Sequence, residues 1–302
     1  MELIGKTNID FIGKRNISFV ISSIIAIVGI IGIIQVARGA ANMGIDFTGG
    51  TSIQLKFAQP VSIEQVRDAL AKHNLKEANL QEIKDGNKIL IKVGKTTLET
   101  GKVADAIEDV FKKEIPGIGY IVESSTEIGP SVGDKLRDDT LKAIVISMIA
   151  IILYIAWRFD FKFGIGASVA TVHDVLAMFA VFYVMNKEIN LLFITAVLTI
   201  AGYSLTDTVV VFDRIRENLH KDLKGSMPVI FNKSINEVLS RTIVTSLTAF
   251  LAALSLFLFG GEVIHDFAFA LVIGIAVGTY SSVFVASPIV SMLESGASKV
   301  KA

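Results

Sequence analysis

The sequence predicts an α-helical membrane bundle of six transmembrane helices, with a folded extracytoplasmic α+β domain inserted after the first helix. Three observations lead to this fold class. The 302-residue chain is 52% hydrophobic with a mean hydropathy of +0.60, above the usual range of soluble domains. Six segments approach the roughly 20 apolar residues that a membrane helix requires. Between the first two lies a stretch of about 100 residues with mixed strand and helix periodicity, enough for one small domain.

The six spans are identified by runs with little or no charge. Residues 17–36 hold no charged side chain. This run is longer than the roughly 7–15 residues of a signal-peptide core, so we expect it to remain as a membrane anchor. The other five spans are predicted over residues 141–157, 164–185, 189–212, 242–259 and 267–293.

The distribution of Lys and Arg predicts the orientation. Basic residues precede the first span (Lys14, Arg15), follow the second (Arg158, Lys162) and recur through the segment 213–241. Because short cytoplasmic loops carry an excess of positive charge, we expect a multi-pass protein of the cytoplasmic (inner) membrane with both termini in the cytoplasm. The predicted parts are residues 1–38 with the first helix, 39–138 as the extracytoplasmic domain, and 139–302 with helices two to six and a cytoplasmic loop at 213–241.

The inserted segment has the pattern of a ferredoxin-like domain. Residues 51–57 alternate as a strand, and Ser62 is placed to cap a helix that follows. A hairpin is predicted around Asp85-Gly86-Asn87, followed by a helix over 98–111 and a last strand over 119–124. Strands and helices in this order favour a ferredoxin-like α+β fold. Residues paired as a nucleophile and its base do not stand out here, and a binding or docking module is the plain interpretation.

Composition excludes several classes of function. The formal net charge of zero gives no basic signature for binding nucleic acid. Without Cys, the chain has neither disulfides nor thiolate metal sites. No residue pattern in the chain points to a metal site, a cofactor or a catalytic centre, so we expect none of the three.

Polar residues inside the predicted spans are the strongest functional signal. An ionisable side chain at the centre of a membrane helix costs roughly 2.5–3.5 kcal/mol on insertion scales, so each one needs a reason. Asp207 lies in the fourth span, Arg241 opens the fifth, and His173 and Asp174 lie near the middle of the third. The functional hypothesis is a proton pathway, in which Asp207 gains and loses a proton and movement of Arg241 controls that exchange. The alternatives are a static hydrogen-bond anchor at Asp207, a helix bridge at His173–Asp174 and an end-of-helix role for Arg241.

Two glycines in the last span have the small-xxx-small spacing. Gly274 and Gly278 are four residues apart on one helix face. Such pairs let two membrane helices approach closely, which is the interpretation we favour over a hinge.

Two sequence motifs carry a family resemblance. One is Gly44-Ile-Asp-Phe-Thr-Gly-Gly50, with Gly44, Asp46, Phe47, Gly49 and Gly50. The other is the longer and more specific run from Thr206 to Asn218, which includes Asp213 and Arg214. Together with His173-Asp174-Val175 and Ser240-Arg241-Thr242, these motifs resemble the SecF branch of the SecD/SecF family of protein-export membrane proteins, within the resistance–nodulation–division superfamily. The resemblance extends over essentially the whole chain.

The resemblance implies a function in protein export. It implies half of a transporter-like assembly, with a separate SecD chain supplying the other half, associated with the SecY–SecE–SecG channel and YajC. Such a pair uses the proton-motive force to move unfolded preprotein across, or insert it into, the lipid membrane. The family's intramembrane proton-pathway residues correspond to Asp207 and Arg241; whether protons or sodium ions are used stays open.

Three other functions compete with this one. An intramembrane aspartyl protease would use Asp174 and Asp207, but the usual Tyr-Asp and Gly-x-Gly-Asp contexts are missing. A small-molecule exporter subunit of the same superfamily would alter sensitivity to drugs or lipids. A structural assembly factor would tolerate Asp207→Asn.

Overall fold

The computed structural model describes residues 5, 7–73, 75, 78–83, 87–94, 103–222 and 225–300. The chain divides into two compact units. One comprises Met1–Asn42 and Ala143–Ala302, and the other comprises Met43–Lys142. The second unit lies close to the predicted inserted domain, 39–138, and begins and ends a few residues later.

Six helical segments of the described residues are long and apolar enough to cross a membrane, which confirms the predicted helical class. They are longer than the predicted apolar runs, because each helix continues into polar sequence at one or both ends. The helices are α1 (Arg15–Ala37), α5 (Pro130–Arg158), α6 (Phe161–Val184), α7 (Leu191–Lys221), α8 (Met227–Phe259) and the sixth segment formed by α9 (Glu262–Ser281), η1 (Ser282–Ala286) and α10 (Ser287–Val300).

The structure differs from the sequence analysis over 213–241, which was assigned to a loop. The helix α7 continues to Lys221 and α8 already begins at Met227, so most of this segment is helical. Hydropathy marks only the apolar part of a helix, whereas the polar turns are supported by pairs one turn apart. Lys221 Nζ lies 2.6 Å from Glu217 Oε1, an i,i+4 ion pair of this kind.

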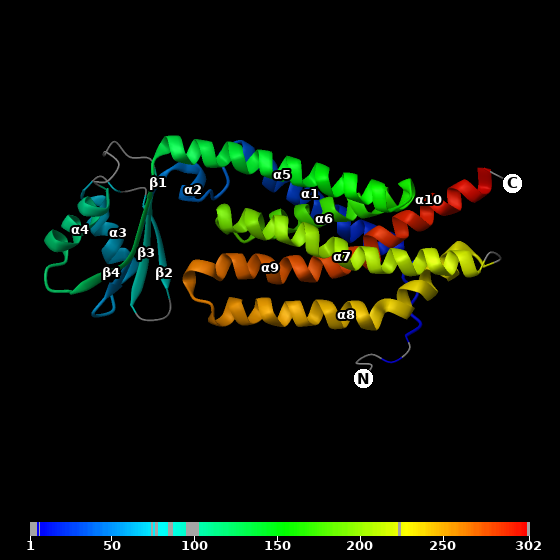
Figure 1. The fold of residues 1–302 in the computed structure, drawn as a ribbon. Coiled ribbons are helices and arrows are strands. Elements are labelled where there is room, and N and C mark those ends of the chain that lie inside the picture. Colours follow the sequence, from blue (N-terminus) through cyan, green and yellow to red (C-terminus); the bar gives the residue numbers. More distant parts are fainter. Residues whose placement is uncertain are drawn as a thin grey trace. The chain divides into compact units, whose positions relative to one another are not determined.

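In the bundle, α6, α7 and α9 form the interior (Figure 1). Their apolar windows are half or more buried, whereas those of α5 and α8 are 6% and 17% buried. The core is rich in phenylalanine, and the Phe163 and Phe212 rings meet edge to face at 5.1 Å between centroids. Helices α5 and α8 therefore present wide apolar surfaces to their surroundings.

The sixth segment contains a π-helical turn, η1 (Ser282–Ala286). Pro288 follows it and has no backbone N–H to donate to the carbonyl of Phe284 one turn earlier, so a regular α-helix is disfavoured here. The Ser287 hydroxyl instead donates to the carbonyl oxygen of Ser282 at 2.9 Å. Single π turns inside α-helices occur often at functional sites.

The inserted unit is a four-stranded antiparallel sheet in the order β2-β3-β1-β4. Alternate residues of β1 and β3 pack under α3 and α4, as their burial pattern shows. Ser62 caps α3 through a capping box with Gln65, as predicted for Ser62. The predicted helix over 98–111 is described only from Val103, and Asp85 and Gly86 of the predicted turn lie outside the described residues. The elements are α2 (Ile45–Thr48), β1 (Gly50–Phe57), α3 (Ile63–Ala71), β2 (Asn79–Ile83), β3 (Lys88–Val93), α4 (Val103–Glu114) and β4 (Tyr120–Ile128).

Candidate functional site

Asp207 is buried in the middle of the helical bundle, on α7. Its side chain is 4% exposed, and its Oδ2 accepts a hydrogen bond of 2.8 Å from the Ser246 hydroxyl on α8. Tyr203 lies one turn earlier on α7, and its hydroxyl donates to the Thr245 carbonyl oxygen at 3.4 Å. A carboxyl group is therefore held between two helices by a neutral donor, in a place where protonation changes the local charge without breaking an ion pair.

Asp174 on α6 forms a second buried carboxyl site. It is fully buried, and its Oδ2 accepts hydrogen bonds from Ser204 of α7 at 2.5 Å and Ser281 of α9 at 2.9 Å. The other oxygen, Oδ1, lies 3.2 Å from the Nδ1 of His173. Since α6, α7 and α9 each supply a member, this site joins the three central helices. Of the two interpretations of His173–Asp174, the helix bridge describes the contacts of Asp174, and the proton-pathway role stays a prediction.

Glycine permits the close approach of α9 to α7 at this site. A methyl group on Gly278 would lie 2.9 Å from the Cβ of Ser204, and one on Gly274 would lie 2.5 Å from a side-chain carbon of Ile200. Both distances are shorter than normal carbon contacts, so the two helices touch only because these side chains are absent. The predicted packing role of Gly274 and Gly278 agrees with this arrangement.

The π turn η1 supplies further hydroxyl groups next to the Asp174 site. Ser281 and Ser282 are adjacent in sequence and both fully buried. Ser281 donates to Asp174, whereas the Ser282 hydroxyl lies 2.9 Å from that of Thr208 on α7. Thus α7 contacts the π turn through Thr208, and contacts α8 through Asp207.

His173 extends the polar cluster toward α1. Its ring lies 6.1 Å from that of Tyr280, whose hydroxyl donates to the Ser18 carbonyl oxygen and lies 3.2 Å from the Ser22 hydroxyl. The His173 Nε2 is buried and has no hydrogen-bond partner among the described residues. One ring nitrogen therefore lies unpaired among the described residues at the edge of the site.

Arg241 does not pair with Asp207 in this structure. Its side chain is exposed on α8 and forms no hydrogen bond or ion pair with the described residues. It lies five residues before Ser246, about 7.5 Å along the helix axis. The Asp207 side chain contacts the buried face of α8, whereas Arg241 extends from its exposed face. The hypothesis that movement of Arg241 controls proton exchange at Asp207 stays a prediction.

Several exposed residues on the membrane helices near Asp207 are polar, which is unfavourable for a surface in contact with lipid. Arg241 and Thr245 are exposed on α8, and Thr199 and Thr206 are exposed on α7, all within helices that could span a membrane. Polar side chains in membrane helices normally face protein or a watery cavity. We call these four residues the polar stripe.

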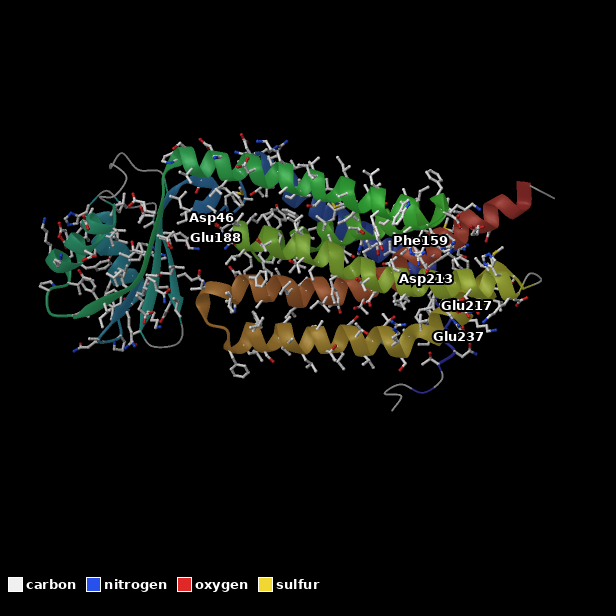
Figure 2. The ribbon with its side chains drawn as sticks, viewed as in Figure 1. Asp46, Phe159, Glu188, Asp213, Glu217 and Glu237 are labelled. Carbon is white, nitrogen blue, oxygen red and sulfur yellow. The ribbon has the colours of Figure 1, made fainter. Side chains whose placement is uncertain are left out.

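The signature residues Asp213 and Arg214 lie at the end of the bundle, where they join helices. Asp213 accepts two hydrogen bonds of 3.2 Å from Arg158 of α5, and Arg214 pairs with Glu217 at 2.6 Å and with Glu237 of α8 at 2.7 Å. Figure 2 shows Asp213, Glu217 and Glu237 at one end of the bundle. These contacts fix helix ends, and they are distinct from the buried carboxyl sites.

The motif from Gly44 to Gly50 forms the short helix α2 and the turn that leads into β1. Gly44 precedes the short helix α2, which contains Asp46 and the buried Phe47. Gly49 and Gly50 have φ values of +69° and +140°, which side chains disfavour. A methyl group on Gly50 would also lie 2.3 Å from the Val93 carbonyl oxygen. The motif therefore has a structural explanation at the start of β1.

Sequence reasoning found the acidic residues but missed their donors. Ser204, Ser246 and Ser281 are common residues, and nothing in their local sequence distinguishes them from the exposed Ser255. The one usable signal is the adjacent pair Ser281-Ser282 inside an apolar span, and it indicates Ser281 alone. Among the described residues, no group of three or more His, Asp or Glu side chains is placed to hold a metal ion.

Comparisons with known proteins agree with these motifs. The family model described as Protein export membrane protein SecD/SecF, C-terminal, matches residues 108–296, and the SecD/SecF GG Motif model matches residues 41–61. The chain is 55% identical to a Protein translocase subunit SecF of Thermodesulfovibrio yellowstonii, over 97% of both chains. It is 41% identical to another from Calditerrivibrio nitroreducens, over 98% of this chain and 97% of the relative.

Solved structures give the same relationship at the level of the fold. The crystal structure of SecDF from Thermus thermophilus, a translocon-associated membrane protein, matches 96% of this chain with a TM-score of 0.85 and 33% identity. A second SecDF structure, in its super-membrane-facing form, matches the whole chain with a TM-score of 0.70. This chain spans only 39% and 40% of the length of those two chains.

Proposed function

Because this chain belongs to the SecD/SecF family of protein-export membrane proteins, we propose that it couples ion movement across the membrane to preprotein translocation and insertion. In this proposal Asp207 takes up and releases the coupling proton. Asp174 and His173 form a second site on the same proton pathway. Arg241 acts when α8 or a partner helix brings a carboxylate near it.

The burial of Asp207 is the observation that carries this proposal. A carboxyl group at 4% exposure whose hydrogen-bond partner among the described residues is the Ser246 hydroxyl can change its proton occupancy without losing an ion pair. The hydroxyl can donate to the carboxylate and, after rotation, accept from the carboxylic acid. A change in the charge of Asp207 would then change how α7 packs against α8, because its hydrogen bond to Ser246 joins these two helices.

A separate SecD chain is the proposed membrane partner. The exposed Arg241 in the polar stripe supports this, since a second membrane protein would supply polar groups where lipid cannot. The two matched structures are SecDF proteins, and this chain covers less than half of each. The SecY–SecE–SecG channel, YajC and unfolded preprotein are proposed as further partners on the basis of the family alone.

The proposed location is the cytoplasmic membrane, with both termini in the cytoplasm and residues 39–138 outside it. The basic residues at the bundle end that carries Arg158, Lys162 and Arg214 support this orientation. We also propose that the inserted domain is ferredoxin-like. Its β-α-β-β-α-β element order and its sheet order, β2-β3-β1-β4, support that assignment.

We propose that the chain is not an enzyme. A protease of the aspartyl type needs two carboxyl groups that share one proton. Asp174 is bonded to Ser204 and Ser281, whereas Asp207 is bonded to Ser246 on another helix, and no hydrogen bond joins the two carboxyl groups among the described residues. Purified protein is accordingly expected to leave a membrane-spanning test peptide uncut.

The test of the proposed function is the variant Asp207→Asn. It keeps the shape of the side chain and the contact with Ser246 but cannot titrate. We expect the rate of proton-driven preprotein translocation in membrane vesicles containing the assembled SecD partner to fall at least about tenfold, equivalent to raising the activation free energy by about 1.4 kcal/mol. Translocation without a proton gradient should stay unchanged.

The matched control is Asp138→Asn, which makes the same chemical change at an exposed position of α5. Amounts of each variant and of its co-purified partner must be equal for the comparison to hold. Full proton-driven translocation by Asp207→Asn would contradict the proposal and favour a structural assembly role.

A further inference from the structure

The segment before the first membrane helix, Ile9–Gly13, is hydrogen-bonded through its backbone to two asparagines of α8. We call this segment the strap. Asn236 makes two hydrogen bonds of 2.9 Å with the strap backbone, accepting from the Ile9 N–H and donating to the Ile9 carbonyl oxygen. Asn232 lies one turn earlier on the same face, and its Oδ1 accepts from the N–H groups of Phe11 and Ile12 at 2.9 and 3.0 Å. Two side chains of α8 thus hold the main chain of a segment more than two hundred residues away in sequence.

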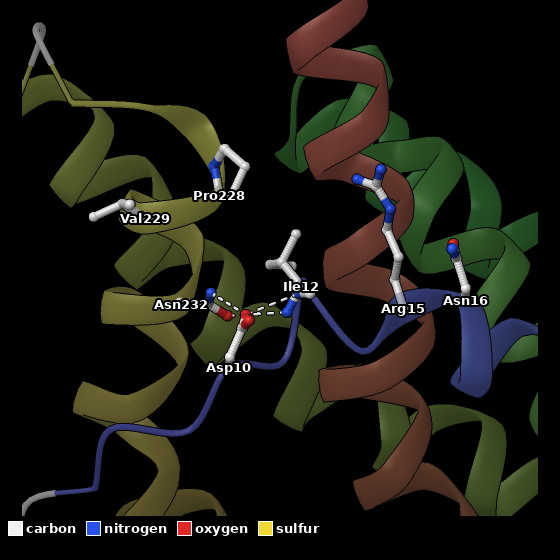
Figure 3. Close-up of a pocket in the computed structure, with 8 residues that line it drawn as sticks. Asp10, Ile12, Arg15, Asn16, Pro228, Val229 and Asn232 are labelled. Carbon is white, nitrogen blue, oxygen red and sulfur yellow. Dashed lines mark hydrogen bonds between the residues drawn. The ribbon is translucent and has the colours of Figure 1, made fainter.

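Asp10 closes the strap on itself. Its Oδ1 accepts 2.7 Å and 2.8 Å hydrogen bonds from the Asn232 side-chain amide and the Gly13 N–H (Figure 3). A methyl group on Gly13 would lie 2.1 Å from Asp10 Oδ2, so glycine leaves room for the Asp10 carboxylate in this turn. Arg15 then begins α1 directly, so the strap fixes the start of that helix.

The strap also reaches the π turn. Phe11 and Ile12 are 3% and 2% exposed and belong to the bundle core. The Phe11 ring meets that of Phe284 in η1 edge to face, with centroids 5.3 Å apart, and Phe284 stacks on Tyr280 beside the Asp174 site. The strap therefore joins α8, α1 and the π turn at one point.

Two features of the strap favour its opening. Its polar contacts are amide hydrogen bonds at exposed or half-buried positions, which water can replace at little net cost. A cavity of about 390 Å³ lies between the strap and the first turns of α1 and α8, lined in part by Ile12, Arg15 and Val229 (Figure 3). The polar contacts of the strap can therefore open toward this cavity, and full opening also withdraws Phe11 and Ile12 from the core.

We propose that the strap is a latch that holds α8 against α1 and the π turn and that opens during each coupling cycle. The inference rests on the proposed function, because α8 carries Ser246, the partner of Asp207, and Arg241. A closed latch keeps α8 in the position in which Ser246 contacts Asp207. An open latch lets α8 move relative to α7.

The contact itself is tested by exchanging its two polar partners in the assembled complex. Asn232→Asp places a carboxylate against Asp10 and should open the latch, whereas adding Asp10→Asn restores an amide–carboxylate pair with the roles reversed. The readout is alkylation of a reporter thiol introduced by Ile12→Cys, which is specific because the chain has no Cys. We expect roughly tenfold faster alkylation in Asn232→Asp and return to the starting rate in the double variant. Equal rates in all three would overturn the latch.

The need for opening is tested by locking the strap. The pair Asp10→Cys and Asn232→Cys is bridged by a short bis-methanethiosulfonate reagent in vesicles with the full complex, and reduction removes the bridge. The matched control, Asp10→Cys with Gly13→Cys, places the same bridge inside the strap. We expect at least about fivefold loss of proton-driven translocation only in the first pair, reversed by reduction.

The two proposals fail in different ways in this experiment. If the bridge leaves translocation unchanged while Asp207→Asn abolishes its proton-driven part, the strap is a fixed anchor and the latch is wrong. If Asp207→Asn is itself silent, the proposed function is wrong, whatever the bridge does.

Discussion

At the scale of single residues, serine hydroxyls hold the two carboxyl groups that are buried among the described residues of the bundle. Asp207 accepts from Ser246, and Asp174 accepts from Ser204 and Ser281. A hydroxyl is a neutral donor and acceptor, so it can satisfy either protonation state of a carboxyl group. An arginine in the same place would stabilise the charged form alone. The observed partners therefore suit exchange of a proton, with Arg241 on the exposed face of α8.

The glycines beside these serines give the first residue-scale prediction. Gly278→Ala should destabilise the folded protein by about 1–3 kcal/mol, because the added methyl would lie 2.9 Å from the Ser204 Cβ and separate α9 from α7. The measurement is thermal unfolding of the purified protein in mild detergent. Gly202→Ala is the control, since nothing lies within 4 Å of its added methyl. Equal unfolding temperatures for the two variants would contradict the packing role.

At the scale of elements, ion pairs fix helices at their ends in both units. In the inserted unit, Glu114 at the end of α4 receives a 2.7 Å contact from Lys72 and a 3.2 Å contact from His73, just after α3. The hydrogen bond from Lys72, followed by that from His73, lowers the pKa of Glu114 below its usual value of 4.5. In the bundle, Arg214 and Glu237 join α7 to α8 in the same manner.

The pair on α3 and α4 predicts a pH dependence. Because the folded state lowers the pKa of Glu114, its charge stabilises the domain above about pH 4.5, and this contribution is lost as pH falls through the folded value. Hydrogen-exchange protection of α3 and α4 in the full-length protein should therefore fall in acid, and Glu114→Gln should flatten that dependence. Asp109→Asn, at a more exposed site on the same helix, is the control and should behave as the unchanged protein. If Glu114→Gln kept the original loss of protection in acid, that loss would come from other titrating groups.

At the scale of the whole molecule, the chain is a membrane bundle with a separate folded unit between its first two spans. The helices α5 and α8 bury 6% and 17% of their apolar windows, so most of their surface is left for lipid or another membrane chain. The bundle core is formed by α6, α7 and α9, which also carry the Asp174 site. The positions most protected from lipid are thus the ones that hold polar groups, as expected for membrane proteins.

The absence of Cys makes the proposed orientation directly measurable. Single thiols introduced by Ser124→Cys in the inserted unit and His220→Cys at the end of α7 lie at exposed positions. A membrane-impermeant maleimide added to intact cells stripped of any outer barrier should label the first and not the second. After permeabilisation, both should react. Labelling of the position at 220 in sealed cells would reverse the predicted orientation.

The sequence by itself determined the six-helix class, the inserted unit and the acidic residues of the candidate site. Apolar runs and buried charge are properties of the residues themselves, and their energetic consequences in a membrane do not depend on the details of packing. The motif from Gly44 to Gly50 was likewise readable, since only glycine adopts the backbone of Gly49 and Gly50 at low cost.

Only the tertiary structure decided which side chains meet. Ser246 contacts Asp207 and Arg241 does not, although Arg241 carries the more obvious charge, because the two lie on different faces of α8. The capture of Ile9–Gly13 by Asn232 and Asn236 joins residues that no local pattern connects. Serine and asparagine hydrogen-bond equally well to water or to any backbone, so their partners are set by the three-dimensional packing of the helices.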